Sequence, residues 1–433
     1  MSGSEREVDV LIVGAGPAGL AAGAELAAAG AGRVEILERE QEAGGVPRHC
    51  HHGGFGGRLD RSAYAWAVAT GYASTGVGAS GYASTGVGTS GPGYARRSVA
   101  AAVDAGADLR TGVTVTGWAG PRSVETTGPH GLERITARAV VLATGARERP
   151  RSARLIPGTR PPGVYTTGEL QQAVHLYGQR IGTTAVVVGG EPVTDAAVAT
   201  LRAAGVHVAA VVTDRPSLPL RLWSRRVPLL TGATVTGLTG RARLTGVGLR
   251  HDDGRTTTLR CDTVVLTGDF VPDHELARRG GLRLDPGTLG PAYDSAFRTS
   301  RPGVFAAGNL LHAVERAGFA AQEGRAVAVP VLHHLAGTED PAGGGRPLVV
   351  DAPLRWIAPN VTGPDGARPQ GDRFVLRTAR RLPHPLLVVS QNGRELHRQR
   401  LLSTAVPGRP FGLAADWLVR VDPDGAPVRI TAR

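Results

Sequence analysis

The sequence contains no lysine, so all 49 of its basic residues are arginines. Without a lysine amine no lysine Schiff base can form, which excludes pyridoxal-phosphate catalysis of the usual kind. A P-loop also needs its lysine to reach the phosphates of a nucleotide. The absence therefore argues against an ATPase of that class.

Cysteine, aromatic residues and long apolar runs are also scarce. The two cysteines, Cys50 and Cys261, are too few for a disulfide framework. The net charge of +12 comes from scattered arginines and aromatic residues make up only 4% of the chain, so we expect no nucleic-acid partner. The chain opens without a charged segment followed by an apolar run, and no uncharged apolar run approaches about 18 residues. We expect a cytoplasmic protein without integral membrane association.

One stretch carries a strong pattern for nucleotide binding. Residues 8–38 read VDVLIVGAGPAGLAAGAELAAAGAGRVEILE. The apolar run Val8–Val13 predicts a buried parallel strand, followed by a glycine-rich turn and an alanine-rich helix over about 17–29. A second strand, Val34–Leu37, is predicted to end at an acidic residue. This is the order of elements in a dinucleotide-binding unit.

Each small or acidic residue of the pattern has a physical task. Gly14 permits a tight turn, Gly16 lets the backbone approach a pyrophosphate, and Gly19 lets the helix pack closely on the strand. The start of the helix presents free N–H groups and a partial positive charge to the phosphates. Glu38 can accept hydrogen bonds from a ribose hydroxyl. The sequence therefore predicts a dinucleotide site.

Two later segments indicate that the dinucleotide is FAD. Residues 137–150, ARAVVLATGARERP, predict a strand that runs into Ala143-Thr144-Gly145, and residues 299–309, TSRPGVFAAGN, predict a strand that ends at Gly308-Asn309. Together with residues 8–38 this set resembles the two-dinucleotide-binding flavoproteins, the superfamily of the pyridine nucleotide–disulfide oxidoreductases. The resemblance implies an α/β fold with two Rossmann-like domains of the three-layer ββα type and non-covalently bound FAD.

The same resemblance suggests which residues contact the cofactor. In the superfamily the final Gly-Asp aspartate binds the ribityl chain, and the helix after it points at the flavin ring. Asn309 stands at the aspartate position here, keeping an acceptor and gaining donors. The residues that we expect to contact the FAD are Gly14, Gly16, Pro17, Ala18, Gly19, Glu38, Arg39, Gly45, Val46, Ala143, Thr144, Gly145, Gly308, Asn309 and Ala320.

The stretch GGVPRHCHHGGFGG, residues 44–57, concentrates histidine and cysteine beside many glycines. Disulfide reductases of this superfamily carry a redox cysteine pair in this region, but only Cys50 lies here, so we do not expect disulfide reduction. Zinc needs three or four ligands, and adjacent residues of an extended segment point to opposite sides. We therefore expect no metal site. One or two imidazoles could instead face flavin or substrate, or all of them could bond backbone at the surface.

This loop also resembles a narrower subgroup that includes hydrogen cyanide synthase, opine oxidases and dye-linked amino-acid dehydrogenases. The match extends to LATGARERPRSARLIPG, GVYTTGELQQ, VPDHELAR and GVFAAGNLLH. It implies an amine or amino-acid substrate, and it makes a second flavoprotein or a small iron–sulfur subunit a candidate partner. His49 or His51 could take the ammonium proton, and Arg48 or Arg316 could hold a substrate carboxylate. Solvated surface positions are the alternative for both arginines.

A second strand–helix–strand pattern, residues 183–214, has a degenerate fingerprint. The second and third glycine positions have become Glu191 and Thr194, and Thr213 stands where the ribose-binding acid would be. Glu191 places an anion at the helix N-terminus, where it would repel a pyrophosphate. NAD(P) binding is therefore doubtful, and a retained scaffold domain is the favoured interpretation.

The predicted organisation places an interrupted FAD-binding domain at 1–157 and 293–345. The second Rossmann domain is expected at 158–292 and a small antiparallel β-domain at 346–433, which has no cysteine to ligate an iron–sulfur cluster. The near-perfect tandem repeat at 71–90 is expected to be a loop, either a product of DNA slippage or a substrate lid.

The function expected from these patterns is that of an FAD-dependent oxidoreductase that moves hydride from an amine or amino-acid C–H bond to flavin. Two alternatives remain open. One is an NAD(P)H-dependent flavin reductase, and the other is a non-catalytic, FAD-loaded subunit of a larger complex.

Overall fold

The computed structural model describes residues 4–56, 89–215, 227–313, 315–338, 345–363 and 366–433. Most of the tandem repeat, residues 71–88, lies outside these ranges, so its interpretation as a loop stays a prediction. None of the helices in the described ranges combines the length and the apolar character that crossing a bilayer requires.

The first unit is built on a parallel sheet. Its strand order is β3-β2-β1-β6, with β17 on the other side of β6. The strands are β1 (Ser4–Val13), β2 (Val34–Glu38), β3 (Asp108–Thr111), β6 (Gly131–Leu142) and β17 (Val304–Ala306). Because Val13 and Ala306 both pair with Leu142, the carboxyl ends of β1, β6 and β17 meet at one edge.

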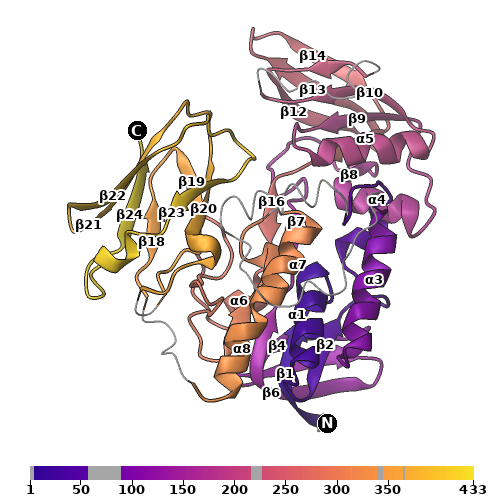
Figure 1. Cartoon of the computed structure of the whole chain (residues 1–433). Coiled ribbons are helices and arrows are strands. Elements are labelled where there is room, and N and C mark those ends of the chain that lie inside the picture. The colour runs from indigo at the N-terminus through magenta and orange to yellow at the C-terminus, as the bar shows by residue number, and fades with distance from the viewer. Residues whose placement is uncertain (1–3, 57–88, 216–226, 314, 339–344, 364–365) are drawn as a thin grey trace.

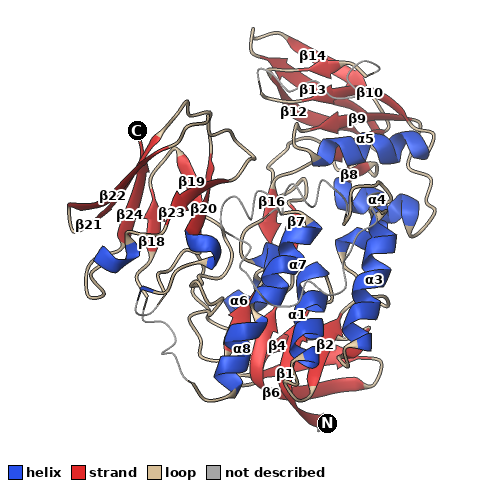
Figure 2. Ribbon diagram, viewed as in Figure 1, coloured by secondary structure: helices blue, strands red, loops and turns tan. Residues whose placement is uncertain are grey.

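Helices cover one face of this sheet, and an antiparallel extension continues it. Alanine and glycine let helices α1 and α7 approach closely, since a Cβ on Gly324 would overlap the backbone of Ala18. Figure 2 shows α1, α3, α7 and α8 lying together over the strands. These elements are α1 (Pro17–Ala28), α3 (Gly91–Asp104), α7 (Ala317–Ala326), α8 (Ala328–Leu335), β4 (Thr114–Trp118) and β5 (Ser123–Gly128).

The second unit repeats the plan with a parallel sheet in the order β11-β10-β9-β15-β8 and a meander of β12, β13 and β14. Runs of valine such as that in β9 are buried on both faces, as a covered parallel strand requires. The elements are β8 (Val164–Thr166), α4 (Thr167–His175), β9 (Thr184–Val188), α5 (Val193–Ala203), β10 (His207–Val212), β11 (Leu229–Leu230), β12 (Ala233–Gly240), β13 (Leu244–His251), β14 (Thr256–Arg260) and β15 (Thr263–Leu266). The predicted fold class, two Rossmann-like domains, is confirmed.

Two short strands carry the chain between the units. β7 (Ala146–Glu148) leaves the first unit and pairs antiparallel with β16 (Phe270–Pro272), which returns to it. Helix α6 (Glu275–Arg279) follows, and its Ala277, like Leu282, belongs to the hydrophobic core of the first unit. We therefore propose that the chain re-enters the first unit near residue 273, about twenty residues before the boundary that the sequence suggests.

The last unit consists of two small sheets packed on each other. Its core is formed by residues such as Phe374 and Trp417, whose rings lie 5.2 Å apart. All pairs are antiparallel except β18 with β24. The strands are β18 (Leu348–Val350), β19 (Leu354–Ala358), β20 (Arg373–Thr378), β21 (Leu386–Gln391), β22 (Arg394–Arg400), β23 (Phe411–Ala414) and β24 (Val428–Ala432). Trp356 and Val375 extend into the core of the first unit, so this unit packs directly on it (Figure 1).

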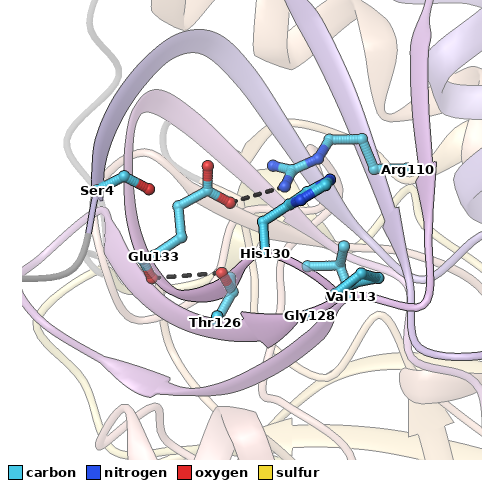
Figure 3. Close-up of a pocket in the computed structure, with 9 residues that line it drawn as sticks. Ser4, Arg110, Val113, Thr126, Gly128, His130 and Glu133 are labelled. Atoms are coloured by element: carbon cyan, nitrogen blue, oxygen red, sulfur yellow. Dashed lines mark hydrogen bonds and ion pairs between the residues drawn. The ribbon is translucent and has the colours of Figure 1, made fainter.

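A small polar pocket lies at the far end of the first sheet (Figure 3). Ser4, at the start of β1, lines it, together with Arg110, which is paired to Glu133 at 2.8 Å. Nine residues of extended strand, about 30 Å, separate Ser4 from the glycine turn after Val13. This pocket is therefore separate from the predicted nucleotide site.

Candidate functional site

The turn between β1 and α1 combines tight packing with one open position. Gly14 has a φ of 105°, and a Cβ on it would lie 2.5 Å from the carbonyl oxygen of Ala143. A Cβ on Gly19 would overlap the carbonyl oxygen of Gly14. A Cβ on Gly16, in contrast, would meet no atom of the described residues within 4 Å. Two glycines are thus required by packing, whereas Gly16 presents bare backbone to open space, as a pyrophosphate needs.

The start of helix α1 is left available for an anion. Its N-cap is Gly16 and Pro17 follows, so no side chain among the described residues caps the first turn, which also lacks an acidic residue. The free N–H groups and the positive end of the helix dipole therefore face outward. These residues fit the diphosphate of a dinucleotide.

Glu38 is anchored beside this turn. The carboxylate is buried at the end of β2, where it accepts hydrogen bonds from the backbone N–H of Ala15 at 3.1 Å and of Glu40 at 3.0 Å. A carboxylate has about four lone-pair positions, so the same group can also accept from a ribose hydroxyl. Arg39 is exposed at the rim, with Nη1 3.6 Å from Oδ2 of Asp273.

The segment after β2 lies directly on the glycine turn. The N–H of Gly44 donates to the carbonyl of Ala15 at 2.9 Å. A Cβ on Gly45 would lie 2.8 Å from Cα of Gly16, which explains why glycine stands there with a φ of 61°. The structure thus brings Gly45 against the predicted pyrophosphate position, whereas the neighbouring Val46 side chain is more than half exposed.

Arg48 is engaged by the chain itself. Its guanidinium group donates to the carboxylates of Glu40 and Glu42, the latter at 3.0 Å. A substrate carboxylate would have to displace both acids to reach it. We therefore do not retain Arg48 as a substrate anchor.

The histidines of this loop have different surroundings. His49 is buried, and burial, followed by the charges of Arg48, His175 and His51, lowers its pKa from 6.5 to about 4. It is therefore a neutral imidazole near pH 7. His51 is exposed and stacks on His175, with ring centroids 4.1 Å apart and planes 4° from parallel. His175, the last residue of α4, has no motif around it, and the sequence analysis missed it.

Neither cysteine is suited to redox exchange. Cys50 is buried and its Sγ lies 3.4 Å from Oε1 of Gln171, and burial raises the pKa of the thiol to about 12. Cys261 is buried in the second unit, where burial raises its pKa to about 11. Within the described ranges, no three His, Cys, Asp or Glu side chains lie close enough to share a metal ion.

The Ala143-Thr144-Gly145 turn lies on the same edge of the sheet. The N–H of Ala143 donates to the carbonyl of Val13 at 2.9 Å. Thr144 Oγ1 donates to the carbonyl of Asp273 at 2.7 Å, and the N–H of Asp273 returns a bond to Gly145 at 2.9 Å. This turn therefore ties the first dinucleotide turn to the strand that returns from the second unit.

The Gly308-Asn309 turn completes the edge. A Cβ on Gly308 would lie 2.6 Å from that of Ala18 and 3.7 Å from that of Ala320, so β17 ends between helices α1 and α7. Asn309 Oδ1 accepts from the N–H of Glu315 at 2.7 Å, and its Nδ2 donates to the carbonyl of Glu315 at 3.1 Å. An aspartate could accept the first bond but could not donate the second. The donor bond to Glu315 thus explains why asparagine stands here. A remaining lone pair on Oδ1 could accept a hydrogen bond from a ribityl hydroxyl.

A buried acid–histidine pair supports this turn, and the sequence analysis missed it. Glu323 of α7 accepts from the N–H of Gly308 at 3.0 Å and lies 2.9 Å from Nε2 of His312. Both side chains are buried. Burial alone lowers the pKa of His312, but the Glu323 carboxylate outweighs it and the pKa is raised. The sequence feature that could have indicated this pair is an acidic residue, Glu323, on the same helix face as the apolar Phe319 and Ala320.

Arg316 directly follows Glu315, whose backbone bonds the Asn309 amide. It is the N-cap residue of α7 and is exposed, directly after the loop that Asn309 holds. Among the residues that the sequence suggests for substrate binding, it is the arginine that we retain.

The dinucleotide turn of the second unit is filled by its own side chains. Glu191 accepts from the N–H of Gly190 at 3.0 Å and forms an ion pair with Arg215 at 3.1 Å. A Cβ on Gly268 would lie 2.6 Å from Cδ of Glu191, so the carboxylate lies over the turn. Thr194 is buried, 3.0 Å from Oγ1 of Thr267. A phosphate would have to displace this carboxylate.

The fold and the first turn together define a dinucleotide-binding protein of the two-Rossmann class. The family model described as "Pyridine nucleotide-disulphide oxidoreductase" matches residues 8–324. The chain belongs to this family.

Curated relatives and solved structures agree with this assignment. The chain is 27% identical to the alpha subunit of the sarcosine oxidase of Corynebacterium sp. (strain P-1), over 82% of this chain and 36% of the relative. It is 28% identical to one subunit of the opine oxidase of Agrobacterium tumefaciens (strain Ach5), over 70% of this chain and 61% of the relative. The bacillithiol disulfide reductase of Bacillus cereus has a similar fold, with a TM-score of 0.60 at 20% identity over 77% of this chain and all of that one. The chain thus spans less than two thirds of the length of either curated relative.

Proposed function

We propose that the chain binds FAD non-covalently and oxidises an amine or amino acid at the C–H bond next to nitrogen. The observation that carries this proposal is the filled turn of the second unit. The Glu191 carboxylate, which accepts from Gly190 and pairs with Arg215, puts an anion beside this turn and would repel a nucleotide phosphate, so we regard NADH and NADPH as poor candidates for the electron donor. An organic substrate would then supply the electrons, and the two curated relatives are named as subunits of a sarcosine oxidase and an opine oxidase.

The chain's own residues would bind and orient the cofactor. Gly16 and the first turn of α1 would hold the pyrophosphate, Glu38 the ribose, and Asn309 the ribityl chain. The same edge of the sheet gathers all three. The bound flavin supplies the hydride-accepting chemistry, which no side chain can supply.

The remaining roles fall to the histidine loop and to α7. A substrate amine is protonated near pH 7, and the ammonium group must lose this proton before hydride can leave the neighbouring carbon, so a base at the site would assist the reaction. A group with a pKa of about 4 is a weak proton acceptor, so we assign this role to the exposed His51 and not to His49. Buried His49 would then orient the loop or donate a hydrogen bond, and Arg316 would hold a substrate carboxylate.

A second candidate function rests on the names of the relatives. Both are subunits, and one is nearly three times as long as the stretch that this chain matches. The chain could instead be an FAD-loaded subunit that receives electrons from a partner, such as a second flavoprotein or a small iron–sulfur subunit.

Anaerobic reduction of the bound flavin tests both proposals. Purified protein is mixed with a panel of primary, N-methylated and cyclic amino acids, and bleaching of the flavin absorption is followed. Reduction by the chain alone supports the amine dehydrogenase. Reduction only after a co-purifying partner is added supports the electron-carrying subunit, whereas rapid reduction by NADH would contradict the argument from Glu191.

A further inference from the structure

The loop that carries Asn309 is held from outside the first unit. We call residues 309–313 and 315–316 the Asn309 loop; it connects β17 to helix α7. Within the loop, the two hydrogen bonds between the Asn309 amide and the backbone of Glu315 close a small ring. The Glu315 side chain points away from this ring, toward the C-terminal unit, where it meets an arginine.

That arginine is Arg377, which lies on β20. Its Nη2 pairs with Oε1 of Glu315, and the two side chains are only 13% and 12% exposed. Its Nη1 donates to the carbonyl of Gly408 at 3.0 Å, and its guanidinium carbon lies 5.5 Å from the ring centroid of Trp356. The Trp356 ring in turn lies 5.3 Å from that of His312 in the Asn309 loop. Charge and packing therefore join the two units at one point.

The energetics of the ion pair between Arg377 and Glu315 favour a role in positioning the Asn309 loop over a role in stabilising the fold. Bringing two charges out of water costs several kcal/mol, so a shielded ion pair adds little net stability, but removing one partner leaves the other charge buried and unpaired. The C-terminal unit also has its own core around Phe374 and Trp417. The ion pair does fix the position of the Glu315 side chain, because the guanidinium group is a rigid planar donor that is bonded to two protein oxygens.

We propose that Arg377 is a positioning residue for the flavin site, so that the C-terminal β-unit completes a site that the two Rossmann units alone would leave loose. Arg377 holds the carboxylate of Glu315, the backbone of Glu315 holds the amide of Asn309, and the next residue, Arg316, is the N-cap of α7. The inference rests on the proposed binding of FAD at this edge. Loss of Arg377 would free the loop that presents Asn309 and Arg316 to the cofactor.

Variants of the full-length protein test this chain of contacts. Arg377→Met removes the positive charge and keeps a long side chain that can pack on Trp356. Arg377→Lys keeps the charge but lacks the planar guanidinium group with its paired N–H donors. Glu315→Gln removes the negative charge of the acceptor. Arg398→Met is the matched control, because Arg398 forms an exposed ion pair with Glu395 in the same unit. Flavin is removed and FAD is titrated back, while its affinity, its dissociation rate and the visible circular dichroism of the bound flavin are measured.

We expect Arg377→Met to raise the dissociation constant for FAD on the order of tenfold or more, as for other lost hydrogen bonds to charged groups. The flavin dichroism should change, Arg377→Lys should recover part of the affinity, and the double variant Arg377→Met/Glu315→Gln should be no worse than the poorer single variant. Arg398→Met should bind FAD like the wild type. A contact that only stabilised the fold would lower the melting temperature and leave the flavin dichroism of the loaded protein unchanged.

Two results would overturn the inference, and they are distinguishable. If Arg377→Met takes up FAD with wild-type affinity and an unchanged flavin spectrum, the positioning role fails while FAD binding stands. If the wild type itself takes up no FAD, the proposed function fails with it. Should Arg377→Met not fold, Glu315→Gln decides in the same way, since it exchanges a single oxygen for an amide nitrogen.

Discussion

Burial of the neutral His49 ring should make the stability of the protein depend on pH in a defined interval. The pKa of His49 is lowered from 6.5 to about 4, first by burial and then by the neighbouring charges of Arg48, His175 and His51. Between these pH values the unfolded chain binds a proton that the folded protein does not. The contribution to stability is therefore fully present above about pH 6.5, is lost as the pH falls toward about 4, and changes no further below that.

The size of the effect follows from the same interval. At about 1.4 kcal/mol per pH unit, a fall from 6.5 to about 4 corresponds to about 3.5 kcal/mol in the free energy of unfolding. About 2.5 kcal/mol of this should be lost by about pH 4.5. The His49→Gln variant has no imidazole to protonate at this position. Between about pH 7.5 and 4.5 its free energy of unfolding should therefore fall by about 2.5 kcal/mol less than that of the wild type.

Urea unfolding followed by circular dichroism measures the difference, with the wild type and the variant compared at each pH. Other groups titrate in the same interval, such as Asp273, whose pKa is raised to about 6 by burial and by Glu275, but they are common to both proteins and cancel. His52→Gln removes an exposed imidazole from the same loop and controls for the loss of a histidine there. Parallel stability curves for wild type and His49→Gln would refute the assignment of a buried, neutral His49.

Three further predictions concern the two dinucleotide turns and the Gly308-Asn309 turn. Gly16→Val should abolish FAD uptake and leave the fold intact, because its side chain enters open space and not packed atoms; purified variant that is still yellow would contradict this. Glu191→Ala should raise the affinity for NADPH by removing an anion from the turn and freeing Arg215, as measured by fluorescence titration; Arg241→Ala, at an exposed position between β12 and β13 of the same unit, is the control. Glu323→Ala should weaken FAD binding and lower the melting temperature by several degrees, since it leaves the N–H of Gly308 and the His312 ring without their buried acceptor; unchanged values for both would exclude a role for the pair.

Local patterns were sufficient to predict the first turn. The helix predicted over about 17–29 is found at Pro17–Ala28, and the second strand ends at Glu38 as expected. The reason is that both elements are specified by neighbours in the chain: an apolar run, a glycine turn and an alanine-rich segment need no distant partner to be recognised. The spacing of Gly14, Gly16 and Gly19 carries the steric requirements that the structure displays.

Contacts between distant segments could not be predicted in this way. His175 stacks on His51 from a helix more than a hundred residues later, and Arg377 reaches Glu315 from another unit. Neither arginine nor histidine carries a local signal for such a partner, because the pairing depends on how whole units pack. The boundary that we propose near residue 273 has the same origin, since only packing shows that Ala277 belongs to the first core.

Two of the positions at which the sequence departs from the superfamily pattern, Asn309 and Glu191, have different physical meanings. At Asn309 the departure adds a donor that the loop uses, because the amide bonds both the N–H and the carbonyl of Glu315, and it leaves an acceptor for a ribityl hydroxyl. At Glu191 the departure adds a charge that the chain neutralises with Arg215 over the turn. The first change is compatible with a bound cofactor and the second opposes one. This contrast between the two turns is the basis of our proposal that the electrons come from an organic substrate or from a partner protein.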